Sequence, residues 1–328
     1  MQRQFITIES PDSLVLAKDT IAHPQPHEIQ IDVAFAGVNR ADLLQRIGLY
    51  PPPEDASPIM GLEVSGTVSQ LGDQVEGIAL GDRVCALCHG GGYATRVNVD
   101  AGHVLSIPDT IDLDIAAALP EALLTVWANV FERGALQPDE TVLIHGGASG
   151  IGSIGIQMAQ ALGHRVLSTA GGAEKCSRVE ALGAAFCADY QSENLLEQFQ
   201  ERGYAGQIDV ILDVAGGDFV DLNFDLAAVD GRVVCIGMMR GGEATIGIGK
   251  VFMKRLTLTG STVRRMSHQD KRDSFNAIRA RVMPEVAAGR IKGLIAETFP
   301  LEKALEAHTT MQKGQHIGKI VLEMPKES

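Results

Sequence analysis

The sequence predicts an α/β protein in which a doubly wound parallel sheet follows a smaller, barrel-like β domain. Its 328 residues suit two domains of roughly 100–200 residues each. The first third holds short segments typical of strands, whereas from about residue 121 short apolar segments alternate with helical stretches. Glycine contributes 36 of the 328 residues, which indicates many tight turns. These observations predict a β-rich first part followed by βαβ units.

Composition argues against several classes of function. The chain has 28 Lys and Arg against 41 Asp and Glu, a net charge of −13, and no run of Lys or Arg exceeds two. Nucleic acid and anionic membranes are therefore not expected as principal partners. No apolar run approaches the roughly 18 residues of a membrane span, and the first residues lack the apolar region of a signal peptide. Five cysteines, an odd number, indicate free thiols in a reducing compartment, so we expect a cytoplasmic protein.

The first domain is predicted from period-2 alternation and turn residues. Glu28–Phe35 alternates polar and apolar residues, as a half-buried strand does. The three prolines at 51–53 continue neither helix nor strand and predict a rigid loop. Further short strands, separated by Gly, Pro and Asp, are expected at Val64–Val68, Asp82–Ala86, Ala94–Val97 and His103–Ile107.

The second domain is predicted from alternating strands and helices. Helices are expected at Ile151–Leu162 and Glu174–Leu182. Nearly continuous apolar strands suit a sheet that is covered on both faces. Strands are expected at Thr141–His145, Arg165–Thr169, Ala185–Ala188, Asp209–Ala215, Arg232–Gly237 and Leu256–Gly260.

The end of the chain does not continue this series. An amphipathic segment at 270–290 is interrupted at Pro284, and a strand is expected at Gly318–Glu323. That strand would return to the first domain and make it discontinuous. We therefore expect one domain from residues 1–120 and 264–328, and a dinucleotide-binding domain from residues 121–263.

A glycine-rich turn at Gly147–Gly152 lies between a predicted strand and a predicted helix. Such a turn lets a pyrophosphate approach the N–H groups of a helix N-terminus. Ser149 stands at the second glycine of the usual G-x-G-x-x-G pattern, and an ordinary strand–helix turn is the alternative. The pattern of short-chain dehydrogenases is also present, but no tyrosine here is followed four residues later by the lysine that their chemistry requires.

The following strand favours NADPH over NADH as the cofactor. An NAD site would place Asp or Glu at the end of this strand, yet Leu167–Gly172 contains no carboxylate. Lys175 and Arg178 follow, where a cation would meet a 2′-phosphate. Alternatively, Lys175 is only a solvated helix residue.

Metal ligation is not expected from the cysteines and histidines. Cys85 and Cys88 form one C-x-x-C pair followed by His89, but a structural zinc needs four ligands and no second pair exists. None of the nine histidines forms a tight ligand pair, and His145 is interpreted as a residue at a strand end.

Four motifs in order along the chain look like the medium-chain dehydrogenase/reductase superfamily: Gly61–Gly66, Gly81–Val84, Gly147–Gly152 and Gly318–Val321. Zinc alcohol dehydrogenases of that superfamily carry a cysteine within the stretch corresponding to residues 37–42 and a histidine at Leu62. The sequence therefore resembles the zinc-free quinone oxidoreductase, or zeta-crystallin-like, branch. Residues 39–46, 48–53, 119–122 and 124–125 look closest to its tumour-suppressor-inducible type.

The resemblance implies a GroES-like domain, a Rossmann domain, NADPH as cofactor and usually a homodimer. It places Asn39 and Tyr50, the expected catalytic residues, near the nicotinamide; a turn residue and a loop-packing residue are the alternatives for these two. The positions implied to bind the cofactor are Thr125, Gly147, Ser149, Gly150, Ile151, Gly152, Gly171, Gly172, Lys175, Tyr190, Gly237, Met238, Met239, Ser261, Thr262 and Val263.

Three of these positions differ from the pattern or allow another role. Gly172 stands where close relatives carry serine, which removes one 2′-phosphate contact. Met238 and Met239 would alternatively fill apolar gaps.

The expected function is metal-free hydride transfer from C4 of NADPH to a quinone in a cleft between the domains. Stacking of two planar rings would supply most of the catalysis through proximity. One alternative is an NADPH-dependent reductase of enoyl thioesters or alkenals. Another is a non-catalytic NADPH-binding structural or sensor protein.

Overall fold

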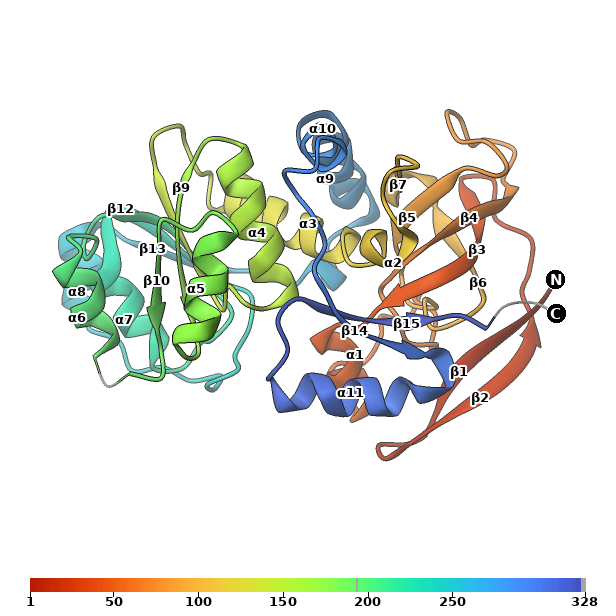
Figure 1. Cartoon of the computed structure of the whole chain (residues 1–328), viewed down its shortest axis with the longest axis horizontal. Helices are drawn as coiled ribbons and strands as arrows, with labels where there is room; N and C mark the ends of the chain where they lie inside the picture. Colours follow the sequence, from red (N-terminus) through yellow and green to blue (C-terminus); the bar gives the residue numbers. More distant parts are fainter. Residues whose placement is uncertain (193, 326–328) are drawn as a thin grey trace. The chain divides into compact units, whose positions relative to one another are not determined.

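The computed structural model describes residues 1–192 and 194–325, which divide into two compact units (Figure 1). The first unit comprises residues 1–122 and 267–287 and the chain from Gly293 onward; the second comprises residues 123–266 and 288–292. The first unit is therefore assembled from both ends of the sequence.

The first unit is built on a seven-stranded sheet. Its order is β14–β15–β3–β4–β5–β7, and β6 also pairs with β3. All pairs are antiparallel except β14–β15. The strands are β3 (Glu28–Gly37), β4 (Glu63–Leu71), β5 (Arg83–Leu87), β6 (Arg96–Asp100), β7 (Val104–Ser106), β14 (Ile295–Pro300) and β15 (Lys319–Glu323).

The pairing of β15 with β3 brings the last strand of the chain against one of the first. Val321 lies opposite Gly37 in this pair. The helices of the unit are α1 (Arg40–Arg46), α2 (Leu113–Ala116), α9 (His268–Arg281), α10 (Met283–Ala287) and α11 (Ala304–Lys313). A two-stranded ribbon of β1 (Gln2–Ser10) and β2 (Ser13–Thr20) was not expected from the sequence.

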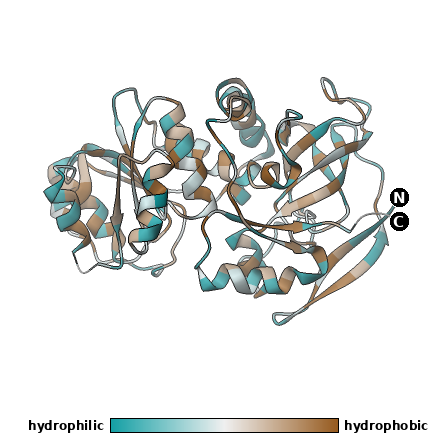
Figure 2. Ribbon diagram, in the orientation of Figure 1, coloured by the Kyte–Doolittle hydropathy of each residue, from teal (hydrophilic) through white to brown (hydrophobic). Residues whose placement is uncertain are grey.

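The second unit contains a six-stranded sheet in the order β10–β9–β8–β11–β12–β13, with every pair parallel. This confirms the predicted doubly wound sheet. Figure 2 shows its central strands as largely apolar, as burial on both faces requires. The strands are β8 (Thr141–His145), β9 (Arg165–Ala170), β10 (Phe186–Asp189), β11 (Ile208–Asp213), β12 (Ala227–Cys235) and β13 (Thr257–Gly260).

The helices of the second unit follow the strands in βα order. They are α4 (Gly150–Ala161), α5 (Ala173–Ala181), α6 (Leu195–Glu201), α7 (Phe219–Leu226) and α8 (Ile248–Lys254). Helix α3 (Pro120–Val126) leads into the unit and continues as a π-helical turn, Trp127–Arg133.

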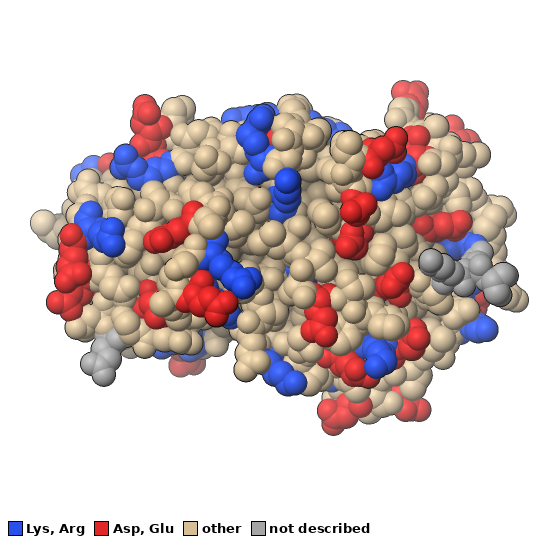
Figure 3. All heavy atoms as spheres, viewed as in Figure 1, with Lys and Arg blue, Asp and Glu red and all other residues tan. Residues whose placement is uncertain are grey.

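One expectation from the sequence is corrected here. The helical run Leu113–Arg133 has the length and hydropathy of a membrane span, although no such run was expected. Its most apolar window is 78% buried within the structure, as in the core helix of a globular protein. Figure 3 shows acidic side chains distributed over the visible face, in keeping with the net charge of −13.

Candidate functional site

The turn between β8 and α4 has the geometry of a phosphate-binding turn. Ser149 is the N-cap of α4, and its Oγ accepts the Gly152 N–H at 3.0 Å. A Cβ on Gly152 would lie 2.3 Å from the Gly146 carbonyl oxygen, and one on Gly147 would lie 2.2 Å from Ser168 Oγ. Only glycine therefore lets strand and helix approach so closely. The N–H groups of Gly150 and Ile151, which precede the capped one, lie at the positive end of the helix dipole, where an anion binds.

The turn after β9 brings together three of the predicted 2′-phosphate positions. Gly172 has φ +90° and is the N-cap of α5. A Cβ on Gly171 would lie 2.8 Å from the hydroxyl oxygen of Tyr190, so this ring lies directly against the turn. Tyr190 remains 41% exposed, and Lys175 lies half-buried in the first turn of α5.

Asp189, at the end of β10, supports this turn and was missed by the sequence analysis. Its Oδ1 accepts the N–H groups of Gly172 and Gln191 at 2.8 and 2.9 Å. Burial, followed by the charge of Asp189, raises the pKa of Tyr190. The carboxylate is thus engaged with the backbone, rather than standing at the end of β9 as an NAD-selective residue does.

Hydrogen bonds connect several positions expected at the nicotinamide half. Ser261 Oγ donates to Asn129 Oδ1 at 2.6 Å, and Asn129 Nδ2 donates to the Thr125 carbonyl at 2.8 Å. Ser261 N–H donates to the Cys235 carbonyl at 3.2 Å, which joins the ends of β12 and β13. Asn129 lies in the π-helical turn, a feature frequent at functional sites, and was not predicted.

The loop after β12 exposes two methionines. Met238 and Met239 are 67% and 68% exposed, so they do not fill gaps in the core. Gly237 lies against the backbone, where a Cβ would be 2.5 Å from the Val214 carbonyl oxygen. Thr262 and Val263 begin the short 3-10 turn that follows β13.

A buried polar network holds the strand ends beside the glycine-rich turn. His145 Nε2 donates to Asn223 Oδ1 at 2.7 Å, because Asn223 Nδ2 itself donates to Asp213 Oδ2 at 3.0 Å. His145 Nδ1 therefore accepts from the Thr169 hydroxyl at 3.0 Å. Burial lowers the pKa of His145, which favours this neutral form. His145 is a strand-end residue, as interpreted from the sequence, and the network that it organises was not foreseen.

In the first unit, Asn39 is buried within a polar cluster. It is the N-cap of α1, and its backbone N–H donates to Asp42 Oδ2 at 2.8 Å. Its Nδ2 donates to Glu63 Oε1 at 2.9 Å, and its Oδ1 accepts from Lys319 Nζ at 2.5 Å. The side chain thus has the hydrogen bonds of a well-held turn residue. Tyr50 is half-buried, and its N–H donates to the Leu44 carbonyl at 3.2 Å.

Lys319 and two carboxylates make this cluster electrostatically unusual. Lys319 forms an ion pair with Glu63 and lies 3.9 Å from Glu121 Oε2. Burial alone would lower the pKa of Lys319, but the charges of Glu63 and Glu121 outweigh it and raise the pKa. Burial raises the pKa of Asp42 to about 6, although Asn39 and Gly61 donate backbone N–H groups to it.

Both parts of the chain match known protein families. Residues 25–109 match the alcohol dehydrogenase GroES-like domain, and residues 150–280 match the zinc-binding dehydrogenase domain. The chain is 31% identical to quinone oxidoreductase 1 of Escherichia coli K12, over 95% of this chain and 96% of that protein.

Modular synthases are also among the relatives. The chain is 29% identical to a component of the phenolphthiocerol/phthiocerol polyketide synthase of Mycobacterium tuberculosis, over 96% of this chain. It spans only 14% of that protein's length.

Two solved structures match over nearly the whole chain. The structure of Escherichia coli quinone oxidoreductase complexed with NADPH is 30% identical and covers 98% of this chain and 100% of its own, with a TM-score of 0.84. The CurK enoyl reductase structure is 25% identical and covers 99% and 100%, with a TM-score of 0.86. With its GroES-like and Rossmann folds and these full-length matches, the chain belongs to the quinone oxidoreductase family of medium-chain dehydrogenases/reductases.

Proposed function

We propose that the protein is an NADPH-dependent reductase of quinones that works without a catalytic metal. The observation that carries the oxidoreductase assignment is the turn at Gly147–Gly152, which fits a pyrophosphate and excludes any Cβ at Gly152. The quinone substrate class rests on the full-length similarity to quinone oxidoreductases. The tumour-suppressor-inducible type remains our finer proposal within the family.

NADPH is supported by the turn after β9. Gly171 and Gly172 stand where an NAD site has a carboxylate, Asp189 accepts the Gly172 N–H, and Lys175 follows in α5. When bound, the cofactor supplies the hydride that reduces the substrate. The chain's part is to hold the dinucleotide at the Ser149 cap and the α5 turn, and to present Thr125, Ser261 and the exposed methionines to its other half.

Proton delivery needs little help from the protein, because the anion of a reduced quinone is stable in water. Tyr50 or solvent is sufficient, and the buried Asn39 acts as a positioning residue for the start of α1. Turnover of Tyr50→Phe tests the tyrosine: an unchanged kcat would remove it from any catalytic role, whereas a lower kcat with unchanged KM for NADPH would support it.

Metal independence is supported by the residues of the first unit. Leu62 is an apolar side chain that offers no ligand atom. The adjacent Glu63 carboxylate is already neutralised by the ammonium group of Lys319. A lysine therefore supplies the local positive charge, and no zinc is needed to satisfy these carboxylates.

A second candidate is a reductase of enoyl thioesters. It is favoured by the similarity to the CurK enoyl reductase over 99% of this chain. Such a reaction needs a hydrogen-bond donor that polarises the thioester carbonyl, a demand that quinone reduction does not make.

One assay separates these possibilities. NADPH absorbance is followed with an ortho-quinone, a para-quinone, a short enal and an enoyl thioester, each repeated with NADH. Faster turnover of a quinone with NADPH would support the proposal, and faster turnover of the enoyl thioester would replace it with the second candidate. NADPH binding without turnover of any acceptor would overturn both and indicate a sensor or structural role.

A further inference from the structure

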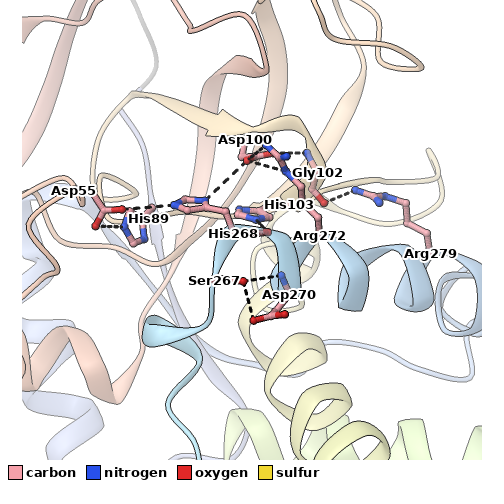
Figure 4. A network of polar contacts seen from close by, with 10 residues as sticks. All are labelled: Asp55, His89, Asp100, Gly102, His103, Ser267, His268, Asp270, Arg272 and Arg279. Atoms are coloured by element: carbon pink, nitrogen blue, oxygen red, sulfur yellow. Dashed lines mark hydrogen bonds and ion pairs between the residues drawn. The ribbon is translucent and has the colours of Figure 1, made fainter.

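Three histidines and two aspartates from distant parts of the sequence meet on one side of the first unit. Asp55 lies in the loop after the three prolines, His89 follows β5, and His268 is the first residue of α9. His89 Nε2 lies 3.2 Å from Asp55 Oδ1, and His268 Nε2 lies 3.7 Å from Asp55 Oδ2. Figure 4 shows these contacts converging on the Asp55 carboxylate.

We propose that Asp55, His89 and His268 form a binding site for a divalent transition metal of the Zn²⁺ class. Their ligand atoms all lie within 4.8 Å of one another. Ligands about 2.0–2.1 Å from a tetrahedral zinc are about 3.3–3.4 Å apart. Here His89 Nε2 lies 3.2 Å from Asp55 Oδ1 and His268 Nε2 lies 3.7 Å from Asp55 Oδ2, so a small rotation of the exposed carboxylate would bring one oxygen to both histidines. Two imidazole nitrogens and one carboxylate oxygen are ligands that zinc favours, and they leave a fourth position for water.

His89 contributes one of the candidate ligand nitrogens. Its buried Nε2 makes no well-aligned hydrogen bond to any described residue, although Asp55 lies close to it. A buried nitrogen without a well-aligned partner is costly, and a metal ion would satisfy it.

Neighbouring residues orient His268 from its other side. Asp100 Oδ2 lies 3.9 Å from His268 Nδ1 and is fixed by Arg272 at 2.6 Å, while Asp100 Oδ1 accepts the Gly102 N–H at 2.8 Å. A carboxylate beside the second nitrogen of a ligand histidine is the usual outer arrangement of zinc sites. The His103 ring stacks on that of His268 at 5.5 Å. His268 Nε2 is thereby turned towards Asp55.

Both positively and negatively charged side chains surround the cluster. Lys271 and Arg272 bring positive charge to the start of α9, and Arg272 is paired with Asp100. Because Arg272 neutralises Asp100, Asp55 is the carboxylate that offsets part of the charge of a bound dication. A pocket of about 480 Å³ borders the cluster, and Asp55, His89, His103 and His268 are among its lining residues. The fourth coordination position therefore opens to solvent.

A metal here would join three separate segments of the first unit. Asp55 lies five residues after Tyr50, so coordination would restrain the loop that follows the tyrosine. The proposed quinone reductase activity does not require this site, since the cofactor turns lie in the second unit. A result that refutes the metal site would therefore leave the quinone reductase proposal intact, and a result that refutes the quinone reductase proposal would leave the metal site intact.

The test is a titration of purified, tag-free and chelator-stripped protein with Co²⁺, followed by competition with Zn²⁺. Tetrahedral Co²⁺ gives a visible absorption band that reports ligand geometry directly. We expect one equivalent to bind, with Zn²⁺ displacing it. Asp55→Asn and His268→Gln should each weaken binding by more than about 100-fold, because even outer-shell losses cost about 10–100-fold.

His23→Gln is the matched control, since His23 is an exposed histidine of the same unit and pairs with Gln70 outside the cluster. It should bind Co²⁺ as the wild type does. The thermal midpoints of the metal-free variants should match that of the wild type, because Asp55 and His268 are both exposed. Absence of a stoichiometric site, or a site that survives both substitutions, would overturn the proposal.

Discussion

Lys319 on β15 and Glu63 on β4 form an ion pair in which both side chains are nearly completely buried, with 5% and 0% exposure. Strand β3 lies between their two strands, so the pair spans the strand that leads to Asn39. Asn39 bonds to both partners, and Glu63 Oε2 accepts the Glu121 N–H at 3.0 Å. The start of α1, which precedes Tyr50, is therefore fixed by contacts from both ends of the chain.

Removing only the cation from this pair should be severely destabilising. We expect Lys319→Met to lower the free energy of unfolding by about 3–5 kcal/mol, because it leaves the Glu63 carboxylate buried and unpaired. The double variant Lys319→Met, Glu63→Gln should recover part of this loss. Urea unfolding of the single and double variants measures the difference, and equal stabilities would show that the buried charge is not the cause.

The close approach in the first turn of α4 predicts a steric effect on cofactor binding. In Gly152→Ala the new Cβ would meet the Gly146 carbonyl oxygen at 2.3 Å and displace the turn, so NADPH affinity should fall by at least tenfold (about 1.4 kcal/mol). Gly249→Ala is the control, because nothing lies within 4 Å of its Cβ and helix α8 tolerates alanine. Fluorescence titration with NADPH measures both, and equal affinities would contradict the assignment of this turn.

Cofactor preference should depend on Lys175. A charged contact to phosphate contributes about 1.5–3 kcal/mol, so Lys175→Ala should raise KM for NADPH about 10–100-fold and leave KM for NADH nearly unchanged. Arg165→Ala serves as the control, since Arg165 is exposed at the first residue of β9, at the other end of the strand from this turn. Steady-state kinetics with both cofactors decide the matter: parallel changes in the two KM values would show that Lys175 does not contact the 2′-phosphate.

The parts of the site that could be predicted are those encoded by local spacing. Gly147, Ser149 and Gly152 lie within a few residues of one another, and their strand–turn–helix context is visible in the sequence. The missing carboxylate at the end of β9 is equally local. Parallel β strands were found for the same reason, because each apolar segment is recognisable by itself.

The parts that were missed depend on which strands become neighbours. Asp189 supports the turn after β9 only because β10 pairs with β9. Lys319 reaches Glu63 only because β15 pairs with β3, and His268 reaches Asp55 only through the packing of α9. No short-range pattern records these contacts. The β1–β2 ribbon was not predicted, because the largely exposed residues of β2 show no clear alternation of apolar and polar side chains.

The buried, neutral imidazole of His308 should make the free energy of unfolding fall on acidification. Burial, with a smaller effect of Arg46, lowers the pKa of His308 to about 3, so the folded state holds a neutral imidazole. The unfolded chain takes up a proton below about 6.5, and the folded chain does not. The contribution of His308 to the free energy of unfolding is therefore fully present above about pH 6.5. It is lost as the pH falls towards 3, by about 1.4 kcal/mol per pH unit.

A variant comparison isolates this effect from that of Asp42. The pKa of Asp42 is raised to about 6, so its proton uptake favours the folded state between about pH 6 and 3.8 and has the opposite sign. His308→Phe removes the contribution of the histidine and leaves that of Asp42, because the Tyr93 hydroxyl still donates to Asp42 at 3.2 Å. Thermal unfolding between pH 7 and 4.5 should show a shallower loss for His308→Phe than for the wild type, and parallel curves would contradict the burial of a neutral His308.

The exposed edge of the parallel sheet supports our proposal that the protein is a homodimer. Strand β13 ends the sheet, so one row of its backbone groups has no neighbouring strand within the described chain. Leu258 on this strand is 47% exposed, and Phe252 and Met253 on α8 are 77% and 71% exposed. An uncharged, exposed edge strand of this kind associates readily with a second copy, and charged side chains are a common means of preventing it. We therefore expect Leu258→Lys, Phe252→Glu to convert a dimer into a monomer in light scattering. Leu16→Lys is the control, because Leu16 is 45% exposed on the β1–β2 ribbon. A dimer that survives the double substitution would place the interface elsewhere, and a monomeric wild type would refute the homodimer.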